Sequence, residues 1–219
     1  MQSPRCSGIP TSSGEVRGTV SLGFLGLLHV PSAFPNIDPV ALLTTIRLPL
    51  QLATFGLPAR LQTSTTCIVE GDPAWAWDEL VPDLGIPTIT TTKGTAIEGW
   101  GLDHVVLLVP DLDDTAAMMG EVLGSPRLRT SVEGRPTAFY RAGPLIEVIE
   151  SPVRAPAIFG IALVTEQSLE ETALAWKERG LTVTGPHPAM QPGREIITVK
   201  GTNAGFAVMS PDGATGTYR

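Results

Sequence analysis

The sequence has 219 residues, of which 42% are hydrophobic, and carries a formal net charge of -7 at neutral pH. This length and apolar content suffice for the core of one large domain or two small ones. The negative charge argues against nucleic acid or an anionic membrane surface as a partner and favours a small molecule. The two cysteines, Cys6 and Cys67, lie far apart in the sequence and show no CxxC or other metal-ligand spacing. They therefore give no support to a disulfide framework and favour a reducing, cytoplasmic compartment.

The first 97 residues are poor in charge and show little hydrophobic periodicity. They hold 5 basic and 7 acidic residues, whereas residues 98–219 hold 10 and 15. Their longest apolar run, residues 19–30, is too short to cross a bilayer. A signal peptide remains an alternative, but the long segment before the run and the presence of Glu15 in that segment argue against it. Three interpretations of residues 1–97 stay open: a small accessory domain, a largely irregular arm, or sequence upstream of the natural start with little structure.

Only weak patterns for secondary structure occur in this segment, and no motif in it carries chemistry. They predict strands, or a short helix and a strand, in residues 40–48 and 61–70. They also predict a short helix over residues 74–80, after Pro73, and a strand over residues 86–92.

Residues 102–124, LDHVVLLVPDLDDTAAMMGEVLG, predict a buried strand followed by an amphipathic helix. The apolar run 105–109 is rich in β-branched residues and stops at Pro110, which is typical of a strand covered on both faces. Asp111 is a favourable N-cap, acidic residues occupy the first turn, and Gly124 predicts the end of the helix.

The same pattern recurs about 56 residues later, in residues 158–180, with a capping box and a closing glycine. His104 precedes the first closing glycine, Gly124, by 20 residues. Gly160 precedes the second, Gly180, by the same interval, so the two segments superimpose with His104 opposite Gly160. The chain therefore contains an internal repeat.

Each predicted helix is followed by three more strands. These strands are expected at 127–132, 137–141 and 145–150 in the first unit, and at 181–184, 195–200 and 205–210 in the second. The predicted class is thus α+β, with paired βαβββ units over about 100–151 and 158–211. The corresponding domains are a poorly defined N-terminal extension (1–97), a main domain (98–211) and a tail (212–219).

Residues 100–211 resemble the vicinal oxygen chelate superfamily, which includes glyoxalase I, extradiol dioxygenases, methylmalonyl-CoA epimerase and the bleomycin-resistance proteins. The resemblance lies in the segments LDHVVLLVPDLDD, PLIEVIES and FGIALV and in the order of the elements. It covers about half of the chain. It implies two curled sheets with helices on their outer faces, a site enclosed between them, and pairing of the chain as a homodimer.

The resemblance also implies four metal-ligand positions, two in each unit. His104 and Glu147 match the positions in the first unit, but Gly160 and Met209 stand where the second unit is expected to supply a histidine and a glutamate. A catalytic divalent ion needs about three protein ligands, so the implied metal site is degenerate. Further ligands would have to come from elsewhere, such as His187, Glu195 or another subunit.

Strand alternation predicts which side chains share a face with His104 and Glu147. The inward set is apolar: Val106, Leu108, Leu145 and Ile149 in the first unit, and Ala162, Val164, Ala207 and Met209 in the second. Arg141, near the expected rim, is an anion contact or a solvated charge. An apolar surface with two polar groups is typical of a small-molecule site. His104 as an ordinary strand histidine, and Glu147 facing solvent in a shifted register, remain alternatives.

The sequence therefore predicts a member of this superfamily that binds a small organic molecule, with no cofactor or with a divalent metal ion. One alternative is a metal-dependent glyoxalase-like lyase or isomerase, or a dioxygenase, that holds a metal at His104 and Glu147 with borrowed ligands and uses Glu147 as the catalytic base. A second alternative is a non-catalytic interaction module. Whether the protein is an enzyme stays open.

Overall fold

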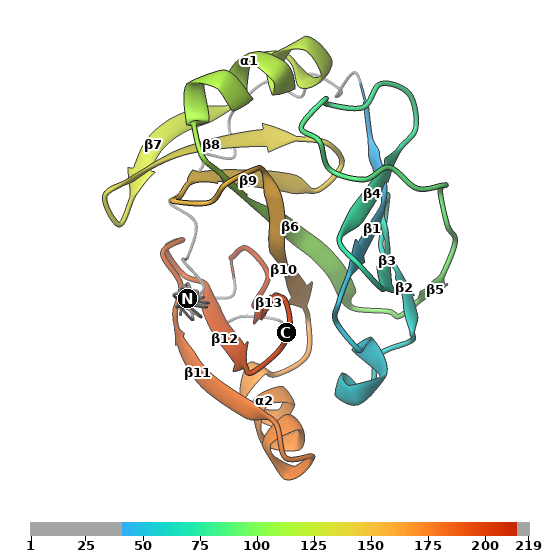
Figure 1. Ribbon diagram of the computed structural model, residues 1–219. Coiled ribbons are helices and arrows are strands. Elements are labelled where there is room, and N and C mark those ends of the chain that lie inside the picture. Colours follow the sequence, from blue (N-terminus) through green and yellow to red (C-terminus); the bar gives the residue numbers. More distant parts are fainter. Residues whose placement is uncertain (1–40, 214–219) are drawn as a thin grey trace, which may run out of the picture.

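The computed structural model describes residues 41–213, which form two β-sheets, two α-helices and a 3-10 helix (Figure 1). The smaller sheet has the strand order β4-β1-β3-β2-β5 and the larger sheet the order β11-β12-β13-β10-β6-β9-β8-β7. The elements of the first part of the chain are β1 (Leu43–Leu48), η1 (Leu52–Phe55), β2 (Arg60–Gln62), β3 (Cys67–Glu70), β4 (Ala74–Trp77) and β5 (Thr95–Ala96). The elements that follow are β6 (Trp100–Val109), α1 (Leu112–Leu123), β7 (Leu128–Val132), β8 (Arg135–Arg141), β9 (Leu145–Glu150), β10 (Ala157–Thr165), α2 (Leu169–Glu178), β11 (Thr182–Pro188), β12 (Glu195–Lys200) and β13 (Gly205–Met209).

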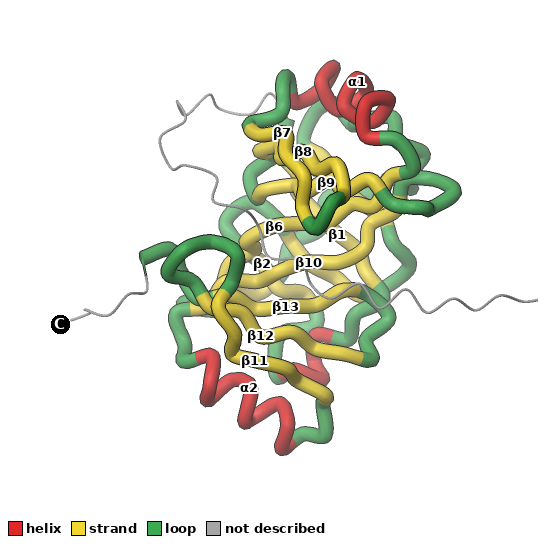
Figure 2. Tube along the Cα trace, turned by 90° about the vertical axis from the view of Figure 1, so that its left-hand side faces the viewer, coloured by secondary structure: helices red, strands yellow, loops and turns green. Residues whose placement is uncertain are grey.

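The larger sheet consists of two βαβββ units, which meet at their antiparallel first strands, β6 and β10. Unit one contains β6 to β9 with α1, and unit two contains β10 to β13 with α2. Away from the junction the order is β9-β8-β7 on one side and β13-β12-β11 on the other, so an approximate two-fold axis relates the units. Figure 2 shows the strands in this order, with the helices at the two ends. The paired βαβββ fold is thus confirmed.

The two α-helices begin at the residues that the sequence predicts. Asp111 caps α1 and accepts a hydrogen bond from the Asp114 backbone N–H at 2.9 Å. Ser168 caps α2 in the same way and accepts one from the Glu171 N–H at 3.2 Å. Among the described residues, no helix has the length and the apolar character needed to cross a bilayer.

Strand β6 is covered on both faces, as its continuous apolar run predicts. Val105, Leu107 and Val109 belong to a large core on the convex side of the sheet, which both helices and the smaller sheet also join. Val106 and Leu108 belong to a separate cluster on the concave side. Figure 1 shows the curved larger sheet with the smaller sheet on its convex side, α1 near one end of it and α2 near the other.

The smaller sheet contacts both units and shares their core. The indole Nε1–H of Trp176 in α2 donates a hydrogen bond to the Phe55 carbonyl oxygen at 3.0 Å. The Trp176 ring also stacks on Phe206 of β13, with 5.7 Å between centroids. At the other end, the Leu43 N–H donates to the Ala142 carbonyl oxygen at 2.9 Å. Residues 43–96 are therefore a folded layer of the same body.

Some details of this layer differ from expectation. The helix expected over residues 74–80 is wrong, because Ala74–Trp77 form strand β4, antiparallel to β1. All four of its residues are buried, so the strand shows no polar alternation that could distinguish it from a helix. The strand expected over residues 86–92 is reduced to a single bridge between Thr88 and Trp75. Residues 1–40, including the apolar run 19–30, lie outside the described residues.

Candidate functional site

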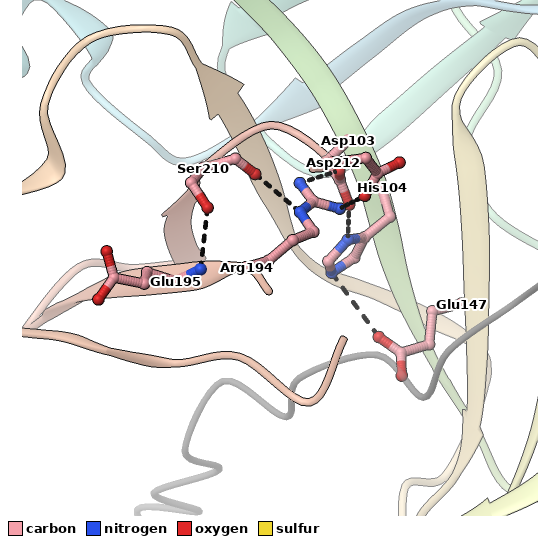
Figure 3. A network of polar contacts seen from close by, with 7 residues as sticks. All are labelled: Asp103, His104, Glu147, Arg194, Glu195, Ser210 and Asp212. Atoms are coloured by element: carbon pink, nitrogen blue, oxygen red, sulfur yellow. Dashed lines mark hydrogen bonds and ion pairs between the residues drawn. The ribbon is translucent and has the colours of Figure 1, made fainter. Parts of the chain in front are cut away.

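His104 on β6 and Glu147 on β9 lie side by side on the concave side of the larger sheet. The two strands are parallel, and their register pairs His104 with Leu145 and Val106 with Glu147. The His104 Nε2 atom lies 3.8 Å from the Glu147 Oε2 atom, and neither side chain has exposed surface. Figure 3 shows the imidazole and the carboxyl group facing each other. The structure therefore brings together the two residues that the resemblance pairs.

Burial dominates the electrostatics of Glu147. Within the described residues, neither of its carboxyl oxygens has a hydrogen-bond partner. Desolvation raises the pKa of Glu147 to about 7; nearby His104 opposes this rise and Asp103 adds to it. A carboxyl group with this pKa is populated both with and without its proton at neutral pH, so it can donate or accept a hydrogen bond there.

His104 is held from behind by its neighbour in the chain. The Asp103 Oδ2 atom lies 2.8 Å from His104 Nδ1. Burial alone would lower the pKa of His104, but the hydrogen bond and the charge of Asp103, together with the charge of Glu147, outweigh burial and raise it. For Asp103, burial opposes ionisation, yet the contacts with His104 and Arg194 keep its pKa below the usual value.

Arg194, in the loop before β12, connects this cluster to unit two (Figure 3). Its Nη2 atom donates a hydrogen bond to Asp103 Oδ1 at 2.6 Å, and its Nε atom donates one to the Ser210 carbonyl oxygen at 2.7 Å. Its Nη1 atom forms an ion pair with Asp212 at 3.3 Å. Only 5% of the Arg194 side chain is exposed, so these contacts satisfy a buried cation.

Asp103 and Arg194 are not among the site residues that the sequence predicts. Strict alternation places Asp103 on the face opposite to His104. In the structure, Ala162 pairs with His104 and the next residue of β10 pairs with Leu102, so Asp103 is the extra residue of a β-bulge. A bulge re-aims a side chain, and here it brings the Asp103 carboxylate to the imidazole. The sequence offers one weak indication of a role for Arg194, which is a charged residue directly before the strand predicted at 195–200.

The strand register corrects one assignment in unit two. In unit one, Glu147 pairs with the residue two positions after His104. In unit two, the residue two positions after Gly160 pairs with Ala207. The residue equivalent to Glu147 is therefore Ala207, and the assignment of Met209 to this position is wrong. The two residues share a face of β13, and sequence patterning does not distinguish a register shift of two.

Gly160, the equivalent of His104, leaves no room for any side chain. A Cβ atom at this position would lie 2.1 Å from the carbonyl oxygen of Gly205 on the adjacent strand. The close approach of β10 to β13 therefore requires a glycine here. Neither equivalent position in unit two offers a donor atom.

The donor set does not fit a catalytic metal ion. His104 and Glu147 provide two ligand types, whereas about three protein ligands are needed. His187 lies in strand β11 and Glu195 at the start of β12, and both are exposed. Across residues 41–213, no group of three or more His, Cys, Asp or Glu side chains is placed to hold a metal. Metal-dependent chemistry therefore has no support from the donors.

The side chains expected beside the pair lie on the concave side. The cluster of unit one contains Val106, Leu108 and Ile149, with Leu145 packed against it. The cluster of unit two contains Ala162, Ala207 and Met209. Arg141 follows Phe139 of the first cluster by two residues and is exposed at the end of β8. That these residues line a ligand pocket stays a prediction.

Known protein structures resemble this chain at low sequence identity over about half of its length. The sequence matches no protein-family model and no curated protein. Similar solved structures include methylmalonyl-CoA epimerase from Mycobacterium tuberculosis, at 17% identity over 51% of this chain and 87% of that one, with a TM-score of 0.42.

A Streptomyces coelicolor methylmalonyl-CoA epimerase, in complex with 2-nitronate-propionyl-CoA, is 14% identical over 51% of this chain and 94% of its own, with a TM-score of 0.42. A hypothetical protein from Bacillus halodurans C-125 is 20% identical over 54% and 99%, with a TM-score of 0.44. At such identities and TM-scores the likeness supports no further conclusion, and the assignment of paired βαβββ units depends on the strand pairing within this chain.

Proposed function

We propose that the concave side of the larger sheet binds a small, largely apolar organic molecule without a metal ion. Apolar side chains of both units would provide the burial, and His104 and Glu147 would contact the polar end of the ligand. Small-molecule sites commonly combine apolar walls with a few polar groups that fix orientation.

One observation carries this proposal: a carboxyl group and an imidazole, 3.8 Å apart and fully buried, lie on a face of the sheet whose other side chains form two apolar clusters. Burying Glu147 costs free energy, because its oxygens lack hydrogen-bond partners among the described residues. Such a group is an unfavourable choice for a purely structural position. A ligand hydroxyl or carbonyl group would supply the missing partner.

The test is a thermal-shift screen with small organic molecules that carry one carbonyl or hydroxyl group on an apolar body. A ligand that binds only the folded state raises Tm, and the rise grows with the logarithm of the ligand concentration relative to Kd. For a confirmed hit, we expect His104→Ala and Glu147→Leu to weaken binding by about tenfold or more, because alanine and leucine offer the ligand no hydrogen-bonding atom.

The matched control is Arg129→Gln, which breaks the exposed ion pair of Arg129 with Asp113 and leaves the concave side intact. This variant should bind with unchanged Kd. Hits that bind the His104 and Glu147 variants as tightly as the wild type would contradict the proposal.

The pKa of Glu147 favours a second candidate function, metal-independent proton transfer. A general base is most effective when its pKa lies near the working pH, and that of Glu147 is about 7. Glu147 would take a proton from a carbon next to a carbonyl group, whose oxygen would receive the electron pair. Exchange of that proton in deuterated water, lost in Glu147→Gln, would support this function; equal exchange in both proteins would exclude it.

A further inference from the structure

Behind His104, a second layer of charged residues determines how the imidazole faces the site. We propose that Asp103 and Arg194 are positioning residues: they keep a proton on Nδ1 of His104 and direct its Nε2 atom toward Glu147. The importance of this arrangement for ligand binding rests on the proposed function, but the location of the proton is a property of the chain that can be measured without a ligand.

The acceptor at Nδ1 is unambiguous. Asp103 is ionised, because its Oδ1 atom accepts a hydrogen bond at 2.6 Å from the guanidinium of Arg194, a cation whose side chain is only 5% exposed. An ionised carboxylate only accepts hydrogen bonds, so the 2.8 Å contact requires a proton on His104 Nδ1. In neutral imidazole the other nitrogen then presents a lone pair, and here that nitrogen is the one 3.8 Å from Glu147.

Arg194 fixes the carboxylate in turn. Its Nη2 atom donates to the Asp103 oxygen that His104 does not use, at 2.6 Å. The guanidinium is itself held by the Ser210 carbonyl oxygen and by Asp212. Because each Asp103 oxygen has its own donor, the carboxylate cannot rotate without losing a charge-assisted hydrogen bond.

The two positioning residues come from different βαβββ units. Asp103 lies in the β6 bulge of unit one, whereas Arg194 precedes β12 of unit two and binds the residue that follows β13. A correctly oriented His104 therefore requires that both units be docked. Unit two, which has no donor at Gly160 or Ala207, contributes to the site through this arginine.

The direct test is NMR of ¹⁵N-labelled histidine in the full chain at alkaline pH. The sequence contains three histidines, so the signals of His104 can be assigned by their loss in His104→Gln. In the wild type, we expect the proton on Nδ1. In Asp103→Asn, Arg194 would engage the amide oxygen, and the amide NH₂ would then face the imidazole. The proton should therefore move to Nε2, because Nδ1 must become an acceptor.

Adding Arg194→Met to Asp103→Asn tests whether Arg194 acts through position 103. Without the arginine, the amide is free to turn its oxygen toward His104, and the proton should return to Nδ1. A double variant that keeps the proton on Nε2 would overturn the role of Arg194. The exposed pair provides the control, because Arg129→Gln should leave every His104 signal unchanged.

The wild type decides the inference even if these variants fail to fold. A wild-type His104 with its proton on Nε2 alone overturns the role of Asp103. An Arg194 Nε proton that exchanges with water as fast as that of half-exposed Arg129 overturns the role of Arg194. A fixed Nδ1 proton in a protein that binds no ligand would instead leave this inference intact and refute the proposed function.

Discussion

The Nε2 atom of His104 and the Oε2 atom of Glu147 lie 3.8 Å apart on adjacent parallel strands, and both side chains are excluded from solvent. In this setting the proton occupancy of each group affects that of the other. Several measurable consequences follow from this pair and from the sheets that hold it.

Glu147→Gln should stabilise the protein at alkaline pH and lose this advantage in acid. The pKa of Glu147 is raised from 4.5 to about 7 on folding, so the folded state binds the proton more tightly than the unfolded chain does. The resulting stability is fully present below about pH 4.5 and is lost as the pH rises through 7. Above that pH the ionised carboxylate costs roughly 3 kcal/mol, which glutamine avoids. Urea unfolding across this pH range measures the difference.

The control for this series is Glu121→Gln, an exposed change in α1, which should leave the pH dependence unaltered. If wild type and Glu147→Gln lose stability in parallel from acid to alkaline pH, Glu147 is not the buried, protonated group inferred here.

Divalent metal ions should not change the stability of the protein. A metal bound only by the folded state raises Tm by mass action, but His104 and Glu147 offer only two ligands, and the equivalent positions Gly160 and Ala207 offer none. Thermal unfolding with added Zn²⁺, Mn²⁺, Co²⁺ or Ni²⁺, and with a chelator, is the measurement. An increase of several degrees with one ion, abolished in His104→Ala, would restore the metal-dependent alternative.

Gly160→Ala should destabilise the protein by about 3 kcal/mol or more, because overpacking against a backbone that cannot retreat is costly. The added Cβ would lie 2.1 Å from the Gly205 carbonyl oxygen. The matched change Gly120→Ala, in α1 with nothing within 4 Å of the new Cβ, should instead stabilise by about 0.5–1 kcal/mol. Denaturant unfolding of both variants is sufficient. A neutral Gly160→Ala would show that β10 and β13 are less closely apposed.

Trp176→Phe tests whether the smaller sheet and unit two unfold together. It removes the hydrogen bond to the Phe55 carbonyl oxygen and should cost about 2 kcal/mol, with a single transition by fluorescence and by circular dichroism. Trp75→Phe is the comparison, since the Trp75 indole nitrogen has no hydrogen-bond partner among the described residues. Trp75→Phe should lower the free energy of unfolding by about 1 kcal/mol less than Trp176→Phe does. Separate transitions for the two probes would contradict a shared core.

Much of the larger sheet is determined by local sequence. The apolar run of β6, the caps Asp111 and Ser168, and the repeated spacing to Gly124 and Gly180 are local signals, and each βαβββ unit has short connections between neighbouring strands. The pairing of His104 with Glu147 came from the family resemblance, and alternation then gave the apolar residues that share a face with each of them. The sequence of the smaller sheet gives weaker signals for secondary structure, because its short strands are buried by partners distant in sequence. Strand β1, for example, lies between β3 and β4.

The sequence by itself predicted the paired units, and the family resemblance that it shows singled out His104 and Glu147 as the two central residues of the candidate site. Tertiary structure decided what surrounds them: the bulge that turns Asp103 toward His104, the buried Arg194 from the other unit, and the register that makes Ala207 rather than Met209 the counterpart of Glu147. The reason is physical. Alternation fixes the face of a side chain from its neighbours in the chain, whereas bulges, registers and contacts between units depend on which strands pair across the sheet.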